Sequence, residues 1–501
     1  MRLVATAILV LLATGCVAGE ADPRPQTVLY LNTDLDIPRL ADTLRIDVYG
    51  PRGVEGEPRT WVRPNDGEWP VSLGVLPRDD GEPARLRIRL YPSTFTARRN
   101  PSEWADTVGL EPDDPIPQFV VDRLVTITPP SAGLAHVEVL LGGDCIGLAA
   151  DLDAWTGCAI VDGSAVEGSP ATAGLGEHDG PLVAGEDSVA GSWTQLEPVG
   201  CTGEPRSDSG VHDAEVCIPG GVFFMGDTRL AGNAGVGEAW ASIPERLVRM
   251  SPFYMDRYEV TVGRFREHAR AIPTTLWDLA ATSFGCTFAS DGSADDFPMN
   301  CVSYQAAEMF CALDGGRVIQ TEAQWEYVAS GLGAEHMYVW GNEVPACEHV
   351  AYARADDVYA RLFMGGSSTE PGGVGRCVGV SGGPDSTPPP AGPVRVGDFP
   401  ADSVEVVEGD PEQVVYDLGG SMEEITSDRN TAYGSRDGTL TDCWAELVDP
   451  TCDEGGNFVT RGGYWAGAPG GLPVGLRRPW NGTETSHTPW TGFRCVRPAA
   501  P

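Results

Sequence analysis

The sequence predicts a multidomain protein, in which an N-terminal all-β sandwich of immunoglobulin-like architecture is followed by a mixed α+β domain with little regular secondary structure. Three observations support this prediction. The chain has 501 residues, more than one hydrophobic core usually organises. Residues 27–141 alternate apolar and polar side chains in short runs separated by Pro, Gly and Asp, as strands do. From Ala214 onward the sequence becomes rich in Gly and Trp and shows few long elements.

Residues 1–16 form the first segment, a predicted lipoprotein signal peptide. A charged start precedes an apolar stretch over residues 3–12, and small residues then lead to Cys16. We expect Cys16 to be lipidated and to become the first residue of the exported protein; an ordinary cleaved signal or a short anchor is the alternative. No other apolar run in the sequence is long enough to cross a bilayer. These features predict a lipid-anchored protein of the bacterial cell envelope, and Val17, in place of an aspartate, favours the outer membrane.

The β-sandwich is predicted over residues 25–160. Its alternating runs are residues 27–31, 44–49, 85–91 and 136–141. Period-two alternation with regular turn signals is typical of a sandwich with an immunoglobulin-like architecture. Modules of this kind serve as spacers or binding surfaces, and nothing in this segment indicates catalysis.

Residues 161–213 are predicted to form a linker between the two domains. This segment is rich in Gly, Ala, Ser and Asp without periodicity.

The cysteine count indicates disulfide bonds. Of 13 cysteines, setting the predicted lipidation site aside leaves 12, an even number that suits disulfides in an oxidising compartment. No C-x-x-C pair is present, which argues against structural zinc. We expect one disulfide between Cys145 and Cys158 at the end of the β domain, and another between Cys201 and Cys217 at the entry to the second domain.

The composition excludes several classes of function. The formal net charge of −38 predicts no nucleic-acid partner, because the phosphate backbone would repel the protein. All 34 basic residues are arginine. Without lysine the chain cannot form a Schiff base, and it cannot supply the lysine of a phosphate-binding loop or of a kinase.

Two helices are predicted in the second domain, which covers residues 214–499. Ser303 can cap a helix that ends at the paired glycines of positions 315–316. Thr321 and Gln324, three residues apart, make a capping box at the start of the other helix. The remainder of the domain reads as short strands and long loops.

Eight ordered motifs identify the second domain. They occupy residues 218–226, 254–261, 300–304, 316–327, 338–343, 416–424, 461–465 and 492–495. Together they resemble the sulfatase-modifying-factor family, whose type member is the formylglycine-generating enzyme. The resemblance implies a compact mixed α+β fold of the kind likened to C-type lectins. In catalytic members it implies a copper-binding cysteine pair that oxidises a substrate cysteine to formylglycine.

The positions that match this cysteine pair carry other residues. In the catalytic branch a Gly-Gly-Ser turn is followed by two cysteines five residues apart, because paired thiolates hold Cu(I). The resemblance places Tyr464 at the serine, Gly467 at the first cysteine and Leu472 at the second. Glu423 stands where the family has an active-site tryptophan. We therefore predict no catalytic residues of this kind, no copper and no formylglycine-generating activity.

Calcium is the cofactor that the resemblance implies. One loop supplies Asp417 and Glu424 as carboxylates and Gly420 and Met422 as main-chain carbonyls, hard oxygen ligands that suit Ca²⁺. A solvated acidic loop is the alternative. No iron is expected, because no two of the seven histidines have the helical spacing of metal ligands.

The resemblance also implies a disulfide between Cys311 and Cys495. A second bond of the family would fall at Ala329 and Arg477, where both cysteines are missing. The remaining cysteines pair by proximity along the chain: Cys286 with Cys301, Cys347 with Cys377, and Cys443 with Cys452.

The leading hypothesis is a calcium-stabilised, non-catalytic recognition domain for a peptide or a glycan, displayed on the envelope by the lipid anchor and the β domain. An oxidoreductase-type enzyme of the same family is the alternative, with a pocket that needs no cysteine pair and with Glu423 or Glu424 doing acid or base work. A purely structural envelope component is a third possibility. Aromatic and arginine side chains are common at binding hot spots, although they are equally typical of a core. On this basis the candidate ligand groove comprises Glu423, Tyr464, Trp465, Arg478, Trp480 and Trp490.

Overall fold

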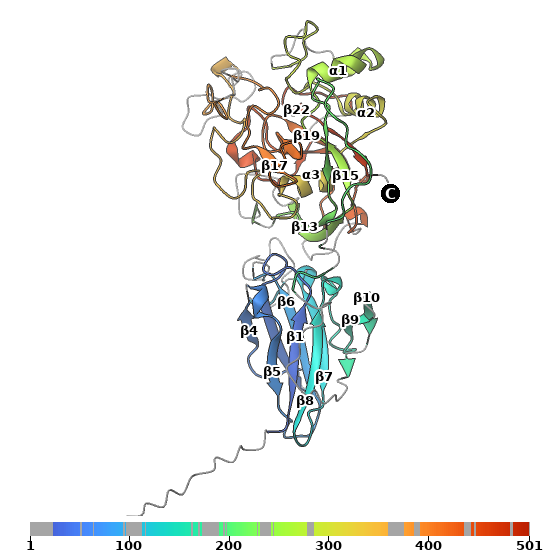
Figure 1. Cartoon of the computed structure of the whole chain (residues 1–501), viewed down its shortest axis with the longest axis vertical. Helices are drawn as coiled ribbons and strands as arrows, with labels where there is room; N and C mark the ends of the chain where they lie inside the picture. The colour runs from blue at the N-terminus through green and yellow to red at the C-terminus, as the bar shows by residue number, and fades with distance from the viewer. Residues whose placement is uncertain are drawn as a thin grey trace, which may run out of the picture.

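The protein consists of two domains stacked along its long axis (Figure 1). The computed structural model describes residues 24–499 except 51–52, 64, 94–95, 97–112, 116, 162–163, 169–170, 173–189, 194–195, 197, 228, 231–241, 244, 278–284, 359–374, 385–390, 435–441, 445–446 and 481–483. The predicted signal peptide and Cys16 lie outside the described residues.

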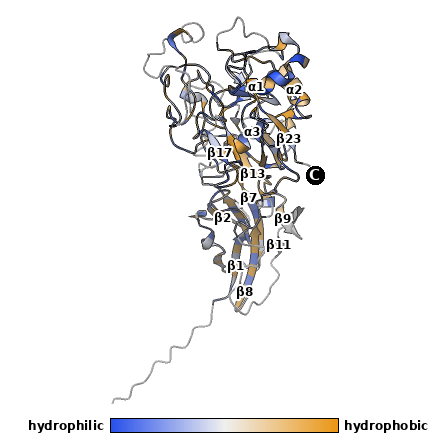
Figure 2. Ribbon diagram, turned by 45° about the horizontal axis from the view of Figure 1, so that its top comes forward, coloured by the Kyte–Doolittle hydropathy of each residue, from blue (hydrophilic) through white to orange (hydrophobic). Residues whose placement is uncertain are grey.

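The N-terminal domain consists of two sheets that share one hydrophobic core. One sheet has the strand order β5-β1-β8, with β1 and β8 parallel, and the other has the order β11-β7-β6-β2-β3, with β4 also paired to β2. Leu29 and Val137 from the first sheet pack in one cluster with Ile88 and Val125 from the second. Hydrophobic and hydrophilic residues are intermixed along these strands (Figure 2), because alternate side chains point to opposite faces of a sheet. The strands are β1 (Gln26–Thr33), β2 (Thr43–Gly50), β3 (Gly53–Val54), β4 (Arg59–Val62), β5 (Val71–Val75), β6 (Ala84–Tyr91), β7 (Val121–Ile127), β8 (Leu134–Leu141) and β11 (Ala171–Thr172).

The segment predicted as a linker, residues 161–213, contains ordered structure. β9 (Gly157–Val161) and β10 (Ser164–Gly168) pair as an antiparallel ribbon, and β11 pairs with β7. Trp193 is 6% exposed and belongs to the core of the β domain. Local composition could not reveal this order, because backbone pairing at long range and one buried indole attach the segment to the domain.

The second domain combines small sheets with three short α-helices in the described residues. The sheets have the strand orders β12-β15-β23-β16, β13-β14, β17-β18 and β21-β20-β19-β22. Their bounds are β12 (Glu215–Ile218), β13 (Gly221–Met225), β14 (Arg246–Met250), β15 (Phe253–Asp256), β16 (Val318–Ile319), β17 (Ser403–Glu405), β18 (Val414–Tyr416), β19 (Glu423–Arg429), β20 (Phe458–Arg461), β21 (Arg478–Pro479), β22 (Thr491–Gly492) and β23 (Cys495–Pro498). The helices are α1 (Val262–His268), α2 (Tyr304–Leu313) and α3 (Glu322–Ala329). In the described part of the chain, no helix combines the length and the apolar character that a membrane span requires.

Side-chain caps begin all three helices. Ser303 caps α2, and Thr321 with Gln324 forms the predicted capping box of α3, with hydrogen bonds of 3.1 and 2.9 Å. These two predicted helices are confirmed. α1, which Thr261 caps, was not predicted, because seven residues are too short to show a helical period.

Six disulfides join the cysteines in the pairs that the sequence analysis expects. Cys311–Cys495 ties α2 to β23 across a sequence separation of 184 residues. Closing so long a loop restricts the unfolded chain and therefore favours the folded state. The others are Cys145–Cys158, Cys201–Cys217, Cys286–Cys301, Cys347–Cys377 and Cys443–Cys452.

The β13–β14 hairpin joins the two domains. Phe224 belongs to the core of the β domain, whereas the preceding residue, Phe223, belongs to a core of the second domain. Phe224 packs edge-on against Phe119 of the β domain, with ring centroids 5.4 Å apart. Arg39 of the β domain donates a hydrogen bond of 3.2 Å to the Val222 carbonyl oxygen. The hairpin is therefore held from both sides and couples the two domains.

Candidate functional site

Two loops of the second domain contain most of the predicted site residues. The glycine loop (residues 462–472) follows β20, and the acidic loop (residues 417–424) leads into β19. Gly462 has a φ of 80°, a left-handed conformation that glycine adopts without strain. The next residue, Gly463, donates its N–H to the Gly419 carbonyl at 2.9 Å. The loops are thus packed against each other, and the fold itself fixes their relative position.

Tyr464 fills the space next to Gly467. The Gly467 N–H donates to the Tyr464 carbonyl at 2.8 Å, which folds the chain into a tight turn. A Cβ atom added to Gly467 would lie 3.0 Å from Cε1 and 3.1 Å from Cδ1 of the Tyr464 ring. A cysteine at this position would press on the ring, which would have to shift slightly to make room.

Leu472 is a core residue. Its side chain is 1% exposed and packs in a cluster with Val350, Tyr352 and Cys377. Its Cδ2 atom lies 2.6 Å from where a Cβ of Gly463 would be. The two positions that match the copper-binding cysteines are therefore filled by tight hydrocarbon packing, with no sulfur ligand at either.

Glu423 has a partner that the sequence did not reveal. It forms an ion pair with Arg478 on β21, and its other oxygen accepts a hydrogen bond of 3.3 Å from the Thr460 hydroxyl. The Arg478 guanidinium lies 5.9 Å from the centre of the Tyr464 ring and against Gly471, where a side chain would collide with it. Because both oxygens of Glu423 are bonded within the protein, this carboxylate has a packing role.

The six residues of the predicted groove divide into two groups. Trp465 is 1% exposed and its indole N–H donates to the Pro489 carbonyl at 3.0 Å, while Trp480 is 4% exposed and belongs to a hydrophobic core. Tyr464 and Trp490 are partly exposed and lie side by side, with ring centroids 5.8 Å apart. Tyr464, Arg478 and Trp490 thus remain as candidate surface, whereas Glu423, which is 8% exposed, and the two buried tryptophans support it from below.

The acidic loop is held rigidly by its neighbours. Asp417 and Ser421 have φ angles of 61° and 63°, so the loop turns sharply twice. The Asp402 carboxylate accepts hydrogen bonds from the N–H groups of Gly419 at 2.7 Å and Gly420 at 2.9 Å. A side chain on Gly420 would collide with Val350. The main chain of this loop therefore has little freedom to rearrange.

Four buried carboxylates surround this loop, and the charge of one guanidinium acts on all of them. Arg494 bonds both Glu424 oxygens, at 2.6 and 2.8 Å, and its charge also acts on Glu259, Asp402 and Asp417. Burial, opposed by two main-chain hydrogen bonds, raises the pKa of Asp402 to about 7. Burial, with neighbouring carboxylates adding to it, raises the pKa values of Glu259 and Asp417 well above their usual range. With all four carboxylates ionised, the cluster would carry three more negative charges than Arg494 neutralises, so these carboxylates must share protons or a bound cation.

A calcium ion at the predicted ligands would offset part of the negative charge of this cluster. Among the described residues, no three His, Cys, Asp or Glu side chains are arranged to hold a metal by themselves, so the main-chain carbonyls of Gly420 and Met422 would have to contribute. Glu424 Oε2 accepts hydrogen bonds from both Arg494 and Gln320, whereas Oε1 accepts only from Arg494 in the described part of the chain and keeps one lone pair for a further bond. Uncompensated buried charge is costly, and a bound cation removes that cost.

Sequence reasoning missed two members of the cluster. Glu259 accepts the Met422 N–H at 3.0 Å and the Ser421 hydroxyl at 3.3 Å, and it is fully buried. Asp402 is equally buried and lies in a segment with no motif. Of these two residues, only Glu259 could have been found from the sequence. It is a charged residue next to the apolar Val260, and it lies within one of the motifs on which the resemblance rests.

The fold and this site define a disulfide-rich domain of small sheets and short helices, in which the apolar glycine loop packs against the acidic loop. The Sulfatase-modifying factor enzyme 1-like domain matches residues 203–499, and the chain belongs to this family. The match begins before residue 214, where the domain was predicted to start.

The named relatives include formylglycine-generating enzymes and proteins that are named as inactive. The formylglycine-generating enzyme of Streptomyces coelicolor is 28% identical over 180 residues, which cover 29% of this chain and 54% of that protein. The inactive C-alpha-formylglycine-generating enzyme 2 of Bos taurus is 29% identical over 199 residues, which cover 32% of this chain and 60% of that protein. The chain thus spans about half the length of the curated relatives it matches. Among solved structures, PvdO from Pseudomonas aeruginosa is 21% identical, with a TM-score of 0.38 over 59% of this chain and 98% of that one.

Proposed function

We propose that this protein is a lipid-anchored component of the bacterial envelope whose second domain is a non-catalytic, calcium-stabilised module for recognising a peptide or a glycan. The β domain would serve as an immunoglobulin-like spacer between the anchor and a C-type-lectin-like recognition domain. The observation that carries the proposal is the glycine loop, where the Tyr464 ring covers Gly467 and Leu472 is buried among apolar side chains. The existence of an inactive relative in the same family supports it.

The absence of formylglycine-generating activity is directly testable. The purified protein would be incubated with copper, oxygen and a sulfatase-type cysteine peptide, and the peptide would be analysed by mass spectrometry. We expect no aldehyde above a control without protein, because the twelve cysteines of the described chain form six disulfides and offer no thiolate. Aldehyde formation by the wild type would overturn the non-catalytic proposal.

A set of restored variants sharpens this test. Gly467→Cys with Leu472→Cys should remain inactive and should lose stability, because the new side chain at 467 meets the Tyr464 ring. Adding Tyr464→Ser removes the contact with the ring and should recover part of the stability, since the carbonyl oxygen of residue 464 stays close to the new side chain. If the double variant is as stable as the wild type, the packing argument for the lost site is wrong.

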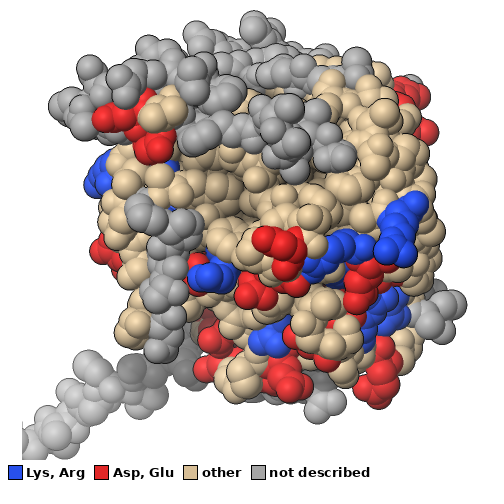
Figure 3. Space-filling model, turned by 90° about the horizontal axis from the view of Figure 1, so that it is seen from above, with Lys and Arg blue, Asp and Glu red and all other residues tan. Residues whose placement is uncertain are grey.

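The recognition surface is proposed at Tyr464, Arg478 and Trp490, with the buried Glu423 holding Arg478 in place. From the end distant from the β domain, the molecule is hollowed near its centre, and the visible lining is mostly uncharged (Figure 3). A peptide library and a glycan array would each be probed with the wild type and with Trp490→Ala. The matched control is Trp61→Ala, since Trp61 is also partly buried but lies in the β domain. Loss of a bound ligand in the first variant alone supports the surface, and equal binding by all three proteins refutes it.

The lipid anchor is proposed at Cys16. Metabolic labelling with an acyl-chain analogue should tag the wild type, and Cys16→Ser should lose the label. Label that persists in Cys16→Ser would exclude this residue as the attachment point.

A further inference from the structure

The recognition surface formed by Tyr464, Arg478 and Trp490 carries hydrogen-bond donors that the protein does not use. In the part of the chain that the structure describes, the indole N–H of Trp490 and the hydroxyl of Tyr464 have no hydrogen-bond partner. Both side chains are partly exposed, so these groups are within reach of a ligand. Arg478 donates to Glu423 through Nη1, and its charge is thereby paired.

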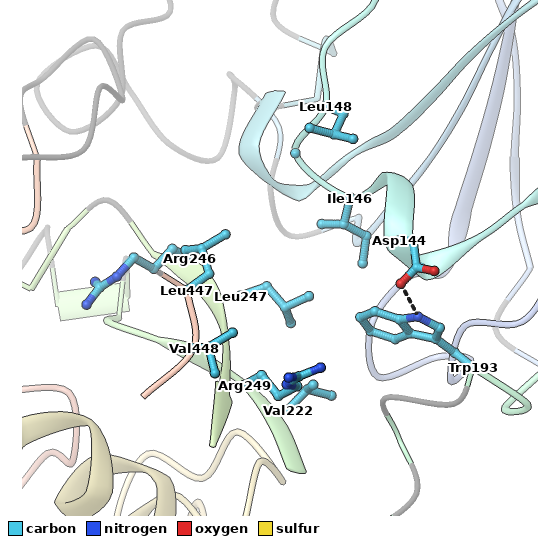
Figure 4. Close-up of a pocket in the computed structure, with 12 residues that line it drawn as sticks. Asp144, Ile146, Leu148, Trp193, Val222, Arg246, Leu247, Arg249, Leu447 and Val448 are labelled. Atoms are coloured by element: carbon cyan, nitrogen blue, oxygen red, sulfur yellow. Dashed lines mark hydrogen bonds between the residues drawn. The ribbon is translucent and has the colours of Figure 1, made fainter. Parts of the chain in front are cut away.

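Other indole groups donate within the protein. Trp193, in the wall of the pocket between the two domains, donates to the Asp144 carboxylate at 2.9 Å (Figure 4). Trp465, directly below the recognition surface, donates to the Pro489 carbonyl at 3.0 Å. Tyr and Trp side chains with an unused polar group are suited to interfaces, because a ligand can bury the ring and accept the hydrogen.

The acceptors around these donors are already occupied. Both carboxylate oxygens of Glu423 are bonded within the protein. The Pro489 carbonyl accepts two side-chain hydrogen bonds, of 3.0 and 2.7 Å, which use both of its lone pairs. The carbonyls of Tyr464 and Trp490 accept main-chain N–H groups at 2.8 and 2.9 Å. The surface therefore offers donors and provides few acceptors.

These properties decide which ligand chemistry fits. A charged ligand would gain little, because the Arg478 guanidinium is already paired with Glu423. A carbohydrate would bring a donor with each hydroxyl, and a hydroxyl buried without an acceptor costs binding free energy. The surface therefore favours an uncharged ligand that has acceptors, lacks donors and packs well on aromatic rings.

A run of prolines has these three properties. Proline has no backbone N–H but keeps its carbonyl oxygen. In the polyproline II conformation these carbonyls make no internal hydrogen bonds, so they are available to a donor. Proline-rich segments dock in grooves lined by aromatic side chains, and their preformed conformation loses little entropy on binding.

We propose, on the basis of the recognition function above, that this surface binds a proline-rich peptide in the polyproline II conformation. Carbonyl oxygens of the peptide accept from the Trp490 indole and the Tyr464 hydroxyl. The pyrrolidine rings pack on the two aromatic rings, whose centroids lie 5.8 Å apart with an angle of 36° between the planes.

The test uses the full exported chain in isothermal titration calorimetry, with a proline decamer blocked at both ends as the probe. The comparison peptide is a decamer of alternating proline and alanine, which restores N–H groups and removes half of the rings. We expect saturable binding of the proline decamer at one site and about tenfold weaker binding of the alternating peptide.

Two conservative variants test the donors. Trp490→Phe keeps an aromatic ring and removes the indole N–H, so it should weaken the binding of the proline decamer about fivefold. Tyr464→Phe removes only the hydroxyl and should have an effect of similar size. The matched control, Trp61→Phe, changes a partly buried tryptophan of the β domain and should leave the affinity unchanged.

The inference is overturned if the proline decamer shows no saturable binding, if the alternating peptide binds equally well, or if Trp490→Phe behaves like Trp61→Phe. Saturable binding of a neutral glycan such as cellohexaose, abolished by Trp490→Ala, would also overturn it, and would leave the proposed recognition function in place. The recognition function itself fails only when no peptide and no glycan depends on Trp490.

Discussion

Two buried charge networks in the second domain differ in their balance. In the balanced network, near α3, two ion pairs are joined by one further arginine and one further carboxylate, whose charges act on the pairs without a direct ion-pair contact. The pairs are Arg461–Glu326 and Arg477–Glu322, the further residues are Arg246 and Asp428, and each of the six is at most 2% exposed. In the acidic network, four carboxylates meet one guanidinium, and each is at most 1% exposed: Glu259, Asp402, Asp417 and Glu424 with Arg494. The three positive and three negative charges of the first network can cancel, whereas the second network needs protons or a cation.

The balanced network has a structural role. Arg477 bonds Glu322 through two contacts of 2.6 and 2.7 Å. Glu322 is the first residue of α3 and Ala329 the last. The ion pair thus joins the same two segments that the resemblance would join by a disulfide between positions 329 and 477.

The largest predicted effect is in the balanced network. Arg477→Met leaves Glu322 buried without its main partner and should lower the free energy of unfolding by about 3–5 kcal/mol. Chemical denaturation with intact disulfides would measure the loss. Adding Glu322→Leu should recover most of it, because two apolar side chains replace the pair. A loss below about 1 kcal/mol in the single variant would mean that the pair does not hold the segments together.

Removing a charged side chain from the acidic network should not lower the stability of the protein when calcium is absent. Asp417→Asn keeps a residue type that tolerates a φ of 61° and removes one excess negative charge. In chelator it should therefore be as stable as the wild type or slightly more stable. In calcium it should lack the gain of about 2.7 kcal/mol that a site at a hundredfold excess over its Kd provides. A calcium response equal to that of the wild type would remove Asp417 from the ligand set.

Glu335 lies outside both networks and serves as a reference carboxylate for comparing them. Burial, opposed by the Phe224 N–H bond and by Arg229, raises the pKa of Glu335 from 4.5 to about 7. The folded protein therefore keeps a proton that the unfolded chain releases, so this contribution to stability is complete below pH 4.5 and is lost as the pH rises through 7.

Glu335→Gln should abolish that pH dependence. Its amide oxygen can still accept the Phe224 N–H, and the stability gained at pH 8 should be on the order of 2 kcal/mol. Denaturation curves at pH 4.5, 6 and 8 would measure it, with the exposed Glu343→Gln as control. If the two variants show the same pH profile, Glu335 is ionised in the folded protein.

Local patterns in the sequence predicted much of the fold. The capping box of Thr321 and Gln324 predicted α3, because a capping box is made by residues close together in the chain. The alternating runs predicted β1, β2, β6 and β8 for the same reason. The cysteine pairs follow mainly from short separations. α1 escaped notice because seven residues show too little periodicity.

The charge networks could not be predicted in this way. Glu259 meets the acidic loop across more than 160 positions, and Arg478 reaches Glu423 across 55. Neither contact leaves a local pattern. The resemblance located the loop, but the excess of buried acid around it is visible only in three dimensions.

The calcium dependence of thermal unfolding tests the central claim most directly. The excess of buried carboxylate predicts that the melting temperature of the wild type rises with free Ca²⁺ and falls when a chelator is added, because the ion binds only the folded state. Mg²⁺ should act weakly, since it demands a smaller and stricter octahedral site than a loop with main-chain carbonyls provides. An identical melting curve in excess calcium and in excess chelator would contradict the account, and would leave protons as the partners of these carboxylates.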